Sequence, residues 1–279
     1  MKLAVLSGKG GAGKTFLAAN LAAAAGRAVY VDCDVEEPNG RLFWQPENLR
    51  QKPVCTQLPA FAADKCTGCR KCVDFCRFHA LLFLKNKPML FAEVCHSCGG
   101  CQLVCPADAI TETNKEVGHL EIGQSGPVQV VTGVMNPGES SGVPIISAAL
   151  EEADALGNTV IVDCPPGSAC PVVESVTRAD MCLLVAEPTA FGFDNFRMVY
   201  ELVQLLGKPC GVVINKADET PYPPLEEFCA ARHLPIVARI PYDREVGACI
   251  AGGHLLARES PAWNHTFSQI LDRMGGAHA

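Results

Sequence analysis

The stretch LSGKGGAGKT, residues 6–15, decides the fold of the larger part of this chain. It satisfies the pattern GxxxxGK(S/T) with Gly8, Gly13, Lys14 and Thr15. An apolar run, 2–6, precedes it, and an alanine- and leucine-rich run, 15–25, follows it. A glycine loop between a strand and a helix wraps nucleotide phosphates with its backbone N–H groups. The sequence therefore predicts a nucleotide site at the carboxyl end of the first strand.

The side chains of this loop have separate expected roles. Lys14 is expected to reach the β- and γ-phosphates, and Thr15 to ligate Mg²⁺. One lysine is enough for this pattern, so Lys9 needs another explanation. The residues expected to contact the nucleotide in this loop are Gly8, Gly10, Gly11, Ala12, Gly13, Lys14, Thr15 and Phe16.

Composition limits the class of protein. The 279 residues suffice for one sizeable core and a small extra module, and 48% hydrophobic with 19% charged residues indicates a compact globule. A formal net charge of -7, without a run of Lys and Arg, argues against a nucleic-acid partner. No apolar segment approaches the roughly 18 residues of a membrane helix, so we expect a cytoplasmic protein without a membrane partner.

Further apolar runs alternate with helical stretches. The apolar runs span 28–31, 159–162, 181–186, 210–214 and 236–240. The helical stretches span 145–155, 193–206 and 225–232. Alternation of this kind indicates parallel strands joined by crossover helices. We therefore predict an α/β fold with a doubly wound, mostly parallel sheet.

This alternation stops between the second strand and about residue 128, where the chain becomes rich in Cys, Lys and Pro. Within this region CTGCRKCVDFC, 66–76, returns as CHSCGGCQLVC, 95–105, 29 positions later. A half-module this short has no core of its own, so metal is expected to hold it together. We predict a nucleotide-binding domain formed by 1–55 and 115–279, with 56–114 as an inserted small α+β domain.

Both copies follow the pattern CxxCxxCxxxC. Three closely spaced thiolates wrap one iron–sulfur cube, and the fourth reaches the cube held by the other copy. The spacing predicts one 4Fe-4S cluster on Cys66, Cys69, Cys72 and Cys105, and a second on Cys76, Cys95, Cys98 and Cys101. Two structural zinc sites with four cysteines each are the alternative.

The eight-cysteine pattern resembles that of bacterial two-cluster ferredoxins over about 50 residues, which implies a ferredoxin-like fold for the insert. One position departs from that pattern. Pro106 follows Cys105 as expected, but Arg77 follows Cys76. Proline's fixed φ is missing there, which leaves the local turn and the potential of the second cluster open.

The form KGGxGKT, with a lysine second, resembles the deviant Walker A motif of the MinD/ParA/Mrp and nitrogenase iron-protein group of P-loop ATPases. The resemblance implies that Lys9 crosses a dimer interface to the nucleotide of the facing subunit. It extends to VDCDVEEPNG, where Asp32 and Asp34 match an acidic pair and Asp34 falls where the attacking water is activated. It extends also to VIVDCPPG, where Asp163 is the implied Walker B carboxylate and Gly167 can turn its N–H toward the γ-phosphate. The implied catalytic residues are Lys9, Lys14 and Asp34.

The segment INKAD, 214–218, allows two interpretations. Asn215, Lys216 and Asp218 satisfy the NKxD pattern by which GTPases bind guanine, and Asn215 also suits the adenine contact of the ATPases. ATP is favoured because the rest of the chain resembles the ATPases. Pro241 and Asp243, in IPYD, are expected to close the base pocket.

Two features outside these motifs have alternative interpretations. Cys170 lies seven residues after Asp163, where the nitrogenase iron protein carries an interface cluster ligand, but no second matching cysteine is present, which favours a buried or reactive thiol. An apolar helical face near the C-terminus is expected to pack on the core, since membrane-binding helices are rich in Lys and Arg. Its members are Trp263, Phe267, Ile270, Leu271 and Met274.

Seven further cysteines mostly interrupt apolar stretches and are expected to be small core residues. They are Cys33, Cys55, Cys164, Cys182, Cys210, Cys229 and Cys249.

Two functions fit these motifs. The first is a dimeric Mg-ATPase, a homodimer or a heterodimer with a related ATPase, whose nucleotide cycle gates electron transfer or metal-cluster delivery to a redox or metallocluster partner. Its expected cofactors are ATP, Mg²⁺ and two 4Fe-4S clusters. The second is a MinD/ParA-like positioning protein whose clusters are structural or sense redox state. The insert leaves the main fold soon after Asp34, which favours communication between the two sites.

Overall fold

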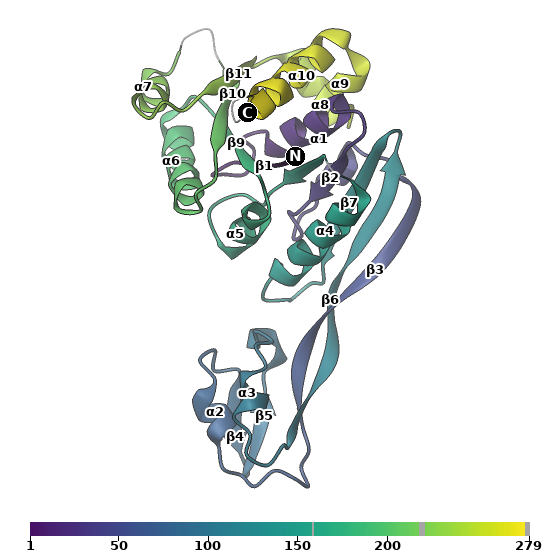
Figure 1. Ribbon diagram of the computed structural model, residues 1–279, viewed down its shortest axis with the longest axis vertical. Coiled ribbons are helices and arrows are strands. Elements are labelled where there is room, and N and C mark those ends of the chain that lie inside the picture. The colour runs from purple at the N-terminus through teal and green to yellow at the C-terminus, as the bar shows by residue number, and fades with distance from the viewer. Residues whose placement is uncertain (158, 218–220, 277–279) are drawn as a thin grey trace.

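The computed structural model describes residues 1–157, 159–217 and 221–276. Figure 1 shows a large α/β domain and a small module that hangs from it on a long two-stranded arm. The strands of the large sheet are β1 (Lys2–Leu6), β2 (Val29–Asp32), β3 (Glu47–Phe61), β6 (Ile110–Ser125), β7 (Val128–Met135), β8 (Val160–Asp163), β9 (Met181–Ala186), β10 (Cys210–Ala217) and β11 (Ile236–Pro241).

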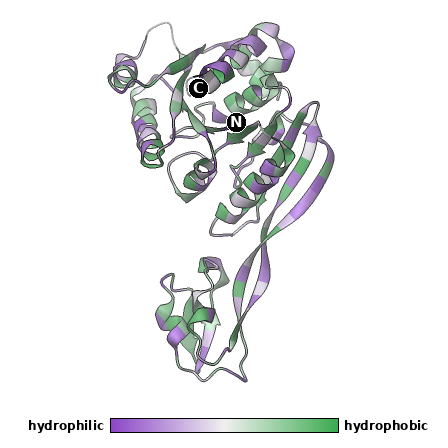
Figure 2. Cartoon of the chain, viewed as in Figure 1, coloured by the Kyte–Doolittle hydropathy of each residue, from purple (hydrophilic) through white to green (hydrophobic). Residues whose placement is uncertain are grey.

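The sheet confirms the prediction of a mostly parallel arrangement. Its strand order is β11-β10-β9-β1-β8-β2-β7-β6-β3. All pairs from β11 to β7 are parallel, whereas β6 pairs antiparallel with both β7 and β3. The central strands are buried on both faces, which is why they are nearly continuous apolar runs (Figure 2).

Helices cover both faces of the sheet, so the domain is doubly wound as predicted. One face packs on α4 (Val143–Leu156), α5 (Cys170–Thr177), α6 (Ala190–Leu205) and α7 (Pro223–Ala231). The other face packs on α1 (Lys14–Ala24), α8 (Arg244–Ala251), α9 (Leu256–Glu259) and α10 (Pro261–Gly276). Each of the five apolar runs predicted as strands overlaps a strand of this sheet.

The apolar face near the C-terminus packs on the core, as expected. Phe267, Ile270 and Met274 on α10 are almost fully buried, and Phe267 makes an edge contact with Phe16 on α1, with ring centroids 5.9 Å apart. Among the described residues, no helix is long and apolar enough to cross a membrane.

The arm consists of β3 and β6, which pair antiparallel from Glu47 and Gln124 to Phe61 and Ile110, with a first register shift between Glu47 and Arg50. The predicted domain boundaries at 55/56 and 114/115 fall inside this ladder, where the register shifts between Val54 and Cys55. A 3₁₀ turn, η1 (Gly40–Leu42), and the buried Trp44 lie between Asp34 and the arm.

The module at the end of the arm contains α2 (Lys71–Phe75), β4 (Leu81–Leu84), β5 (Lys87–Leu90), η2 (Ala92–Val94) and α3 (Gly100–Leu103). The 29-residue sequence repeat is also a repeat of backbone conformation. Positive φ angles occur in pairs 29 positions apart at Gly68 and Ser97, at Arg70 and Gly99, and at His79 and Asp108. Ala80 and Ala109, which keep the same offset, are both buried. The two halves of the module are therefore alike in structure as well as in sequence.

Candidate nucleotide site and cysteine cavities

Three strands bring the predicted nucleotide-binding residues to one edge of the sheet. Asp163 at the end of β8 lies in register with Asp32 on β2 and with Val5 on β1, which leads into the glycine loop. Because these strands are parallel, their carboxyl ends meet at this edge, which is the usual ligand position in such sheets. A cavity of about 1390 Å³, measured to its open mouth, lies here.

The glycine loop has a conformation that depends on glycine. Gly11 and Gly13 have φ angles of +78° and +94°, and Gly13 caps the N-terminus of α1. A Cβ atom at Gly8 would collide with the backbone of Asn195 on α6. Gly10 has open space where a Cβ would be, and it lines the cavity together with Gly11 and Gly13. The loop can therefore present backbone N–H groups and a helix N-terminus to an anion.

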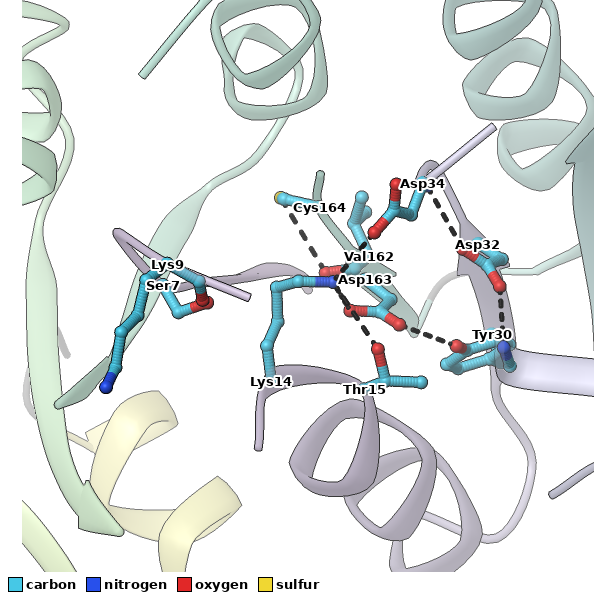
Figure 3. Close-up of polar contacts among 11 residues, drawn as sticks. Ser7, Lys9, Lys14, Thr15, Tyr30, Asp32, Asp34, Val162, Asp163 and Cys164 are labelled. Carbon is cyan, nitrogen blue, oxygen red and sulfur yellow. Dashed lines mark hydrogen bonds and ion pairs between the residues drawn. The ribbon is translucent and has the colours of Figure 1, made fainter. Parts of the chain in front are cut away.

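Lys14 is at the centre of a buried charged network (Figure 3). Its Nζ lies 2.6 Å from Asp163 Oδ1 and 4.0 Å from Asp34 Oδ2, and it donates to Thr15 Oγ1 at 3.4 Å. Burial alone would lower the pKa of Lys14, but the carboxylates of Asp163, Asp32 and Asp34 together outweigh it, and the pKa is raised. The lysine is thus held as a cation among acidic groups at the base of the cavity.

Asp163 and Asp32 are both fully buried, and each carboxylate has hydrogen-bond donors. The Tyr30 hydroxyl donates to Asp163 Oδ2 at 2.9 Å, and the backbone N–H groups of Gly40 and Asp34 donate to Asp32 at 2.8 and 3.1 Å. Burial, with the nearby Asp163 charge, raises the pKa of Asp32 to about 8. Asp32 therefore fixes the turn that follows β2, and Tyr30 orients Asp163.

Asp34 is the partly exposed member of this acidic group. Its side chain is 21% exposed and borders the cavity. Burial, opposed by Lys14 and reinforced by Asp163, raises the pKa of Asp34 to about 6. The position suits a carboxylate that contacts a small polar molecule in the cavity, and the pKa leaves the group ionised at neutral pH.

Lys9 points away from this network in Figure 3. Its Nζ forms an ion pair with Glu187 Oε2 at 2.5 Å and lies 5.2 Å from the centre of the exposed Phe191 ring. The resemblance implied a contact to a facing subunit. In this structure, which contains one chain, Lys9 contacts Glu187 and the Phe191 ring of the same chain, and it lies at the rim of the cavity.

The residues expected to bind the base are placed differently from the prediction. Asn215 donates to the Ala12 carbonyl at 2.7 Å, and Lys216 donates to the Gly11 carbonyl at 2.8 Å. Both side chains therefore support the glycine loop. Asp218 lies outside the described residues.

Pro241 and Asp243 do not border the cavity of the described chain. Another part of the cavity wall is formed by Leu42 and Phe43, at the end of η1, and by the segment 250–253, at the end of α8. These residues belong to none of the sequence motifs described above. Leu42 and Phe43 could have been expected near the nucleotide only because they follow the acidic loop that contains Asp34.

Gly167 has a φ angle of +90°, which a non-glycine residue rarely adopts. Its N–H donates to the Ser7 carbonyl at 3.1 Å. Here the N–H ties the loop after β8 to the start of the glycine loop, whereas the resemblance implied that it faces the γ-phosphate. Thr15 and Phe16 follow at the start of α1, and both border the cavity; the Phe16 ring also packs against Phe267 on α10.

The eight cysteines of the module line two separate cavities, in the crossed sets that the spacing predicts. One cavity, of about 360 Å³ to its mouth, is lined by Cys66, Cys69, Cys72 and Cys105. The other, of about 430 Å³, is lined by Cys76, Cys95, Cys98 and Cys101. Each set takes three cysteines from one copy of the repeat and the fourth from the other copy. We call these the first and the second cysteine cavity.

The thiols of each cavity are near enough to affect one another. Burial raises the pKa of Cys101 to about 11, and the neighbouring Cys95 and Cys98 add to this. In the first cavity the backbone N–H of Ala109 donates to Cys105 Sγ at 3.4 Å, and a backbone hydrogen bond at Lys71 lowers the pKa of the exposed Cys69. In the part of the chain that the structure describes, no three His, Cys, Asp or Glu side chains are arranged around a single ion.

A groove of about 1180 Å³ separates the second cysteine cavity from the large domain. Cys95 and His96 line both this groove and the second cavity. Across the groove lie Glu36, two residues after Asp34, and the exposed Cys170 at the start of α5. The second cavity is therefore close to the loop that borders the nucleotide cavity.

The other cysteines divide into two groups. Five are buried in the core of the large domain, which confirms their interpretation as small core residues: Cys33, Cys164, Cys182, Cys210 and Cys229. Cys249 is half-buried against the core. The same interpretation is wrong for Cys55, which is exposed on the arm, because alternate residues of a two-stranded arm face solvent. Cys170 is also exposed. The alternative of a buried thiol at this position is therefore wrong, and that of a reactive thiol stays a prediction.

Comparisons with known proteins are consistent with the fold of the large domain. Two uncharacterized proteins of Methanocaldococcus jannaschii are similar over almost the whole chain. MJ0578 is 29% identical over 98% of this chain and 96% of its own length, and MJ0579 is 26% identical over 95% and 94%.

Among solved structures, the septum site-determining protein MinD of Pyrococcus horikoshii, complexed with Mg-ADP, is similar in fold. Its TM-score is 0.61 at 18% identity, with 100% of this chain and 98% of that chain covered. The model of the CobQ/CobB/MinD/ParA nucleotide-binding domain matches residues 3–256. This chain therefore belongs to the CobQ/CobB/MinD/ParA family of nucleotide-binding proteins.

Proposed function

We propose that the protein is a dimeric Mg-ATPase whose nucleotide cycle controls two 4Fe-4S clusters in the small module, for electron transfer or cluster delivery to a partner protein. The observation that carries this proposal is the pair of cysteine cavities, each lined by four cysteines from both repeats, on an arm that begins beside the nucleotide cavity. The ferredoxin-like character of the module and the boundaries 56–114 are part of the proposal.

The residues of both cavities fit a 4Fe-4S cluster. Such a cluster is held by four cysteine thiolates and stabilised by N–H donors to sulfur, as Ala109 provides for Cys105. A cube of iron and sulfide holds its four cysteine sulfurs farther apart than one zinc ion does, and no compact single-ion group occurs among the described residues. When bound, the clusters supply one-electron transfer.

The nucleotide cavity fits Mg-ATP. The N–H groups of the glycine loop and the Lys14 ammonium suit phosphate oxygens, and Thr15 with Asp163 suits Mg²⁺. Mg²⁺ offsets phosphate charge when it is bound. We propose that Asp34 orients the attacking water and accepts its proton, and that Asn215 and Lys216 hold the loop in its binding conformation. A role of Asn215, Pro241 and Asp243 at the base would require the cavity wall to close further.

A chain of contacts runs from Asp34 toward the arm. Val35 packs so closely on Gly133 and Gly142 that a Cβ at either glycine would collide with it. The Val35 carbonyl also accepts a hydrogen bond from the Met135 N–H at 2.9 Å. A movement of Asp34 is therefore passed to β7 and to the loop before α4.

That loop is joined to the arm. Lys115 on β6 forms an ion pair with Glu139 at 2.8 Å, and Asn136 donates from its side chain to the Glu116 carbonyl at 3.2 Å. The groove beside the second cysteine cavity is lined by Lys115 and Glu139 themselves. These contacts support control of the module by the nucleotide, because they connect the Asp34 loop with the strand that carries the module.

Weakening this connection is expected to uncouple the two sites. In wild-type protein, a non-hydrolysable ATP analogue and ADP should give different rates of cluster reoxidation by a small dye. Lys115→Gln removes the ion pair with Glu139, an interaction of on the order of 1 kcal/mol, so it should reduce this difference by up to about fivefold. Rapid-mixing absorbance spectroscopy measures both rates.

Lys52→Gln is the matched control, since Lys52 also joins the arm to the large domain, by an ion pair with Glu152 at 2.9 Å. It does not contact the Asp34 loop and should leave the difference intact. The proposal of coupling through Lys115 is overturned if both variants behave alike. If the nucleotides give equal rates even in the wild type, the positioning function becomes the better account.

The positioning function remains the second candidate. It is favoured by the similarity of the fold to MinD and by the family to which the chain belongs. In this case ATP-dependent dimerisation would place a partner, and the clusters would stabilise the module or sense redox state. The effect of nucleotides on the clusters separates the two candidates, because only the first requires it.

The two lysines of the glycine loop are expected to have separable effects. Lys14→Ala removes the cation beside the phosphates, so nucleotide affinity should fall by about 10–100-fold, which corresponds to a charged hydrogen bond of about 1.5–3 kcal/mol. Lys9→Ala should change affinity by less than about threefold. It should instead abolish dimerisation with ATP, if Lys9 leaves Glu187 to contact the facing subunit's nucleotide.

Binding of a fluorescent nucleotide and sedimentation velocity measure these two effects. Lys2→Ala serves as a control, because Lys2 forms an ion pair with Asp154 at 2.7 Å and does not border the nucleotide cavity. A Lys9→Ala protein that still dimerises with ATP as the wild type does would remove the proposed role of Lys9.

A further inference from the structure

The two ends of the module differ in charge although they are alike in backbone structure. The half that spans 64–87 carries six cations and two acids, whereas the equivalent half, 93–116, carries one cation and four acids. None of the six cations of the first half has a cationic counterpart 29 positions later. One of them, Arg77, corresponds to Pro106 and follows Cys76 of the second cavity, whereas the other five belong to the segments that form the first cavity. They are Lys65, Arg70, Lys71, Lys85 and Lys87, and their counterparts are Val94, Gly99, Gly100, Asn114 and Glu116.

These five cations lie on the segments that form the first cysteine cavity, within two residues in sequence of a lining residue, and we call them the basic rim. All five are exposed. Arg70 lines the cavity, with its guanidinium 5.3 Å from the centre of the Phe83 ring. A Cβ at Gly68, in the cysteine loop, would lie 3.5 Å from the Asn86 carbonyl, so the turn that bears Lys85 and Lys87 lies against that loop. Two acids lie among these cations: Asp74, 3.6 Å from Arg70, and the exposed Asp64, which precedes Lys65.

The surface inside the basic rim is apolar. Phe61, Phe83, Pro88 and Ile110 line the first cavity, and Cys69 is exposed there. Apolar side chains surrounded by charged groups are typical of a protein interface, whereas a nucleic-acid surface needs polar contacts to phosphate and sugar. All residues that line the first cavity belong to the module, whereas the second cavity adjoins the groove against the large domain. The first cavity is thus the end that a partner can approach.

We propose that the basic rim is the docking site for an acidic one-electron carrier protein. The inference rests on the proposed function, because it requires a cluster in the first cavity. The chain as a whole has a net charge of -7, so an acidic carrier is repelled elsewhere and is directed to this end. The reduced carrier gives one electron to the cluster, so that the carrier is oxidised and the cluster reduced by one electron each, and no bond is made or broken.

The test uses the full chain with its iron, prepared anaerobically, and a purified acidic plant-type ferredoxin as probe. Isothermal titration calorimetry measures the Kd at two salt concentrations. Lys85→Glu combined with Lys87→Glu should weaken binding at low salt by about tenfold or more, and the wild-type Kd should rise with salt. Arg27→Glu combined with Arg232→Glu makes the same change in net charge at exposed sites outside the module and should leave the Kd within about twofold.

Iron and sulfide analysis of the same samples tests the proposed clusters separately from the proposed docking site. Protein without iron or sulfide means that the proposed clusters are wrong. Protein with its full iron content, but with equal Kd values for the rim variant and the control, overturns the docking site alone. A single-stranded DNA that binds more tightly than the ferredoxin, and loses affinity in the rim variant, also overturns it, since the rim would then be a nucleic-acid surface.

Discussion

Replacement of Cys105 by serine is expected to remove about four of the roughly eight irons per chain, and to remove them from the first cysteine cavity. Cys105 belongs to the second copy of the repeat, yet it lines the cavity formed by Cys66, Cys69 and Cys72. Loss of one thiolate leaves three ligands for a cluster that needs four. Iron and acid-labile sulfide analysis, with EPR of the reduced protein, measures how many clusters remain.

Two variants make this result specific to the crossed arrangement. Cys76→Ser, in the first copy, should damage the second cavity, because Cys76 lines it together with Cys95, Cys98 and Cys101. Cys55→Ser removes an exposed cysteine of the arm that lines neither cavity, and it should keep the full iron content. If Cys105→Ser instead destroys the cluster of its own sequence copy, the crossed assignment is wrong. Stoichiometric zinc without sulfide would favour the structural zinc sites.

The sequence was sufficient for the parts of the fold that depend on local pattern. Central parallel strands are buried on both faces, so 159–162 and 181–186 appear as continuous apolar runs and can be recognised without a partner. The glycine loop has its own signature, and the cysteine spacing predicts which four thiols share a cavity. In each of these cases the information lies within a short stretch of chain.

The sequence was insufficient where distant segments meet. β7 joins the sheet beside β2, although 128–135 lies after the insert and was not predicted as a strand. Tyr30 orients Asp163 and Glu187 holds Lys9, but nothing in the neighbouring residues predicts either contact. The wall of the nucleotide cavity at Phe43 depends on how the chain turns after Asp34, and that turn is fixed by the tertiary contact between Gly40 and Asp32.

Replacement of Asp34 by asparagine is expected to lower ATP hydrolysis by about 10²–10⁴-fold with little loss of nucleotide affinity. The carboxylate is proposed to accept a proton from the attacking water, and an amide cannot do so. Lys14 and the glycine loop, which bind the phosphates, stay in place, because the closest Asp34 contact to Lys14 is 4.0 Å. Phosphate release and binding of a fluorescent nucleotide measure the two effects separately.

Glu37→Gln is the matched control, because Glu37 also borders the cavity but is exposed and has no proposed role in hydrolysis. It should hydrolyse ATP within about twofold of the wild type. An equal loss of ATP hydrolysis in both variants would mean that the rate depends on the negative charge around the cavity and does not require a proton acceptor at Asp34.

The pH dependence gives a further test of the role of Asp34. Because burial raises its pKa to about 6, the proton-accepting form is lost as pH falls through that value. Wild-type hydrolysis should therefore fall by about tenfold per pH unit below 6, while the residual rate of Asp34→Asn should not follow this slope. A wild-type rate that stays constant down to pH 5 would assign the base to another group.

The same variant also tests whether the nucleotide and the module communicate. Without hydrolysis, Asp34→Asn protein holds ATP, and the contacts from Val35 through Glu139 to Lys115 should then keep the arm in one arrangement. A tenfold preference for that arrangement requires a difference of only about 1.4 kcal/mol between the ATP and ADP forms. Cluster reoxidation should thus differ between Asp34→Asn protein with ATP and with ADP. Identical rates with confirmed ATP occupancy would mean that the module is only attached to the ATPase, and positioning would then be the better account of the function.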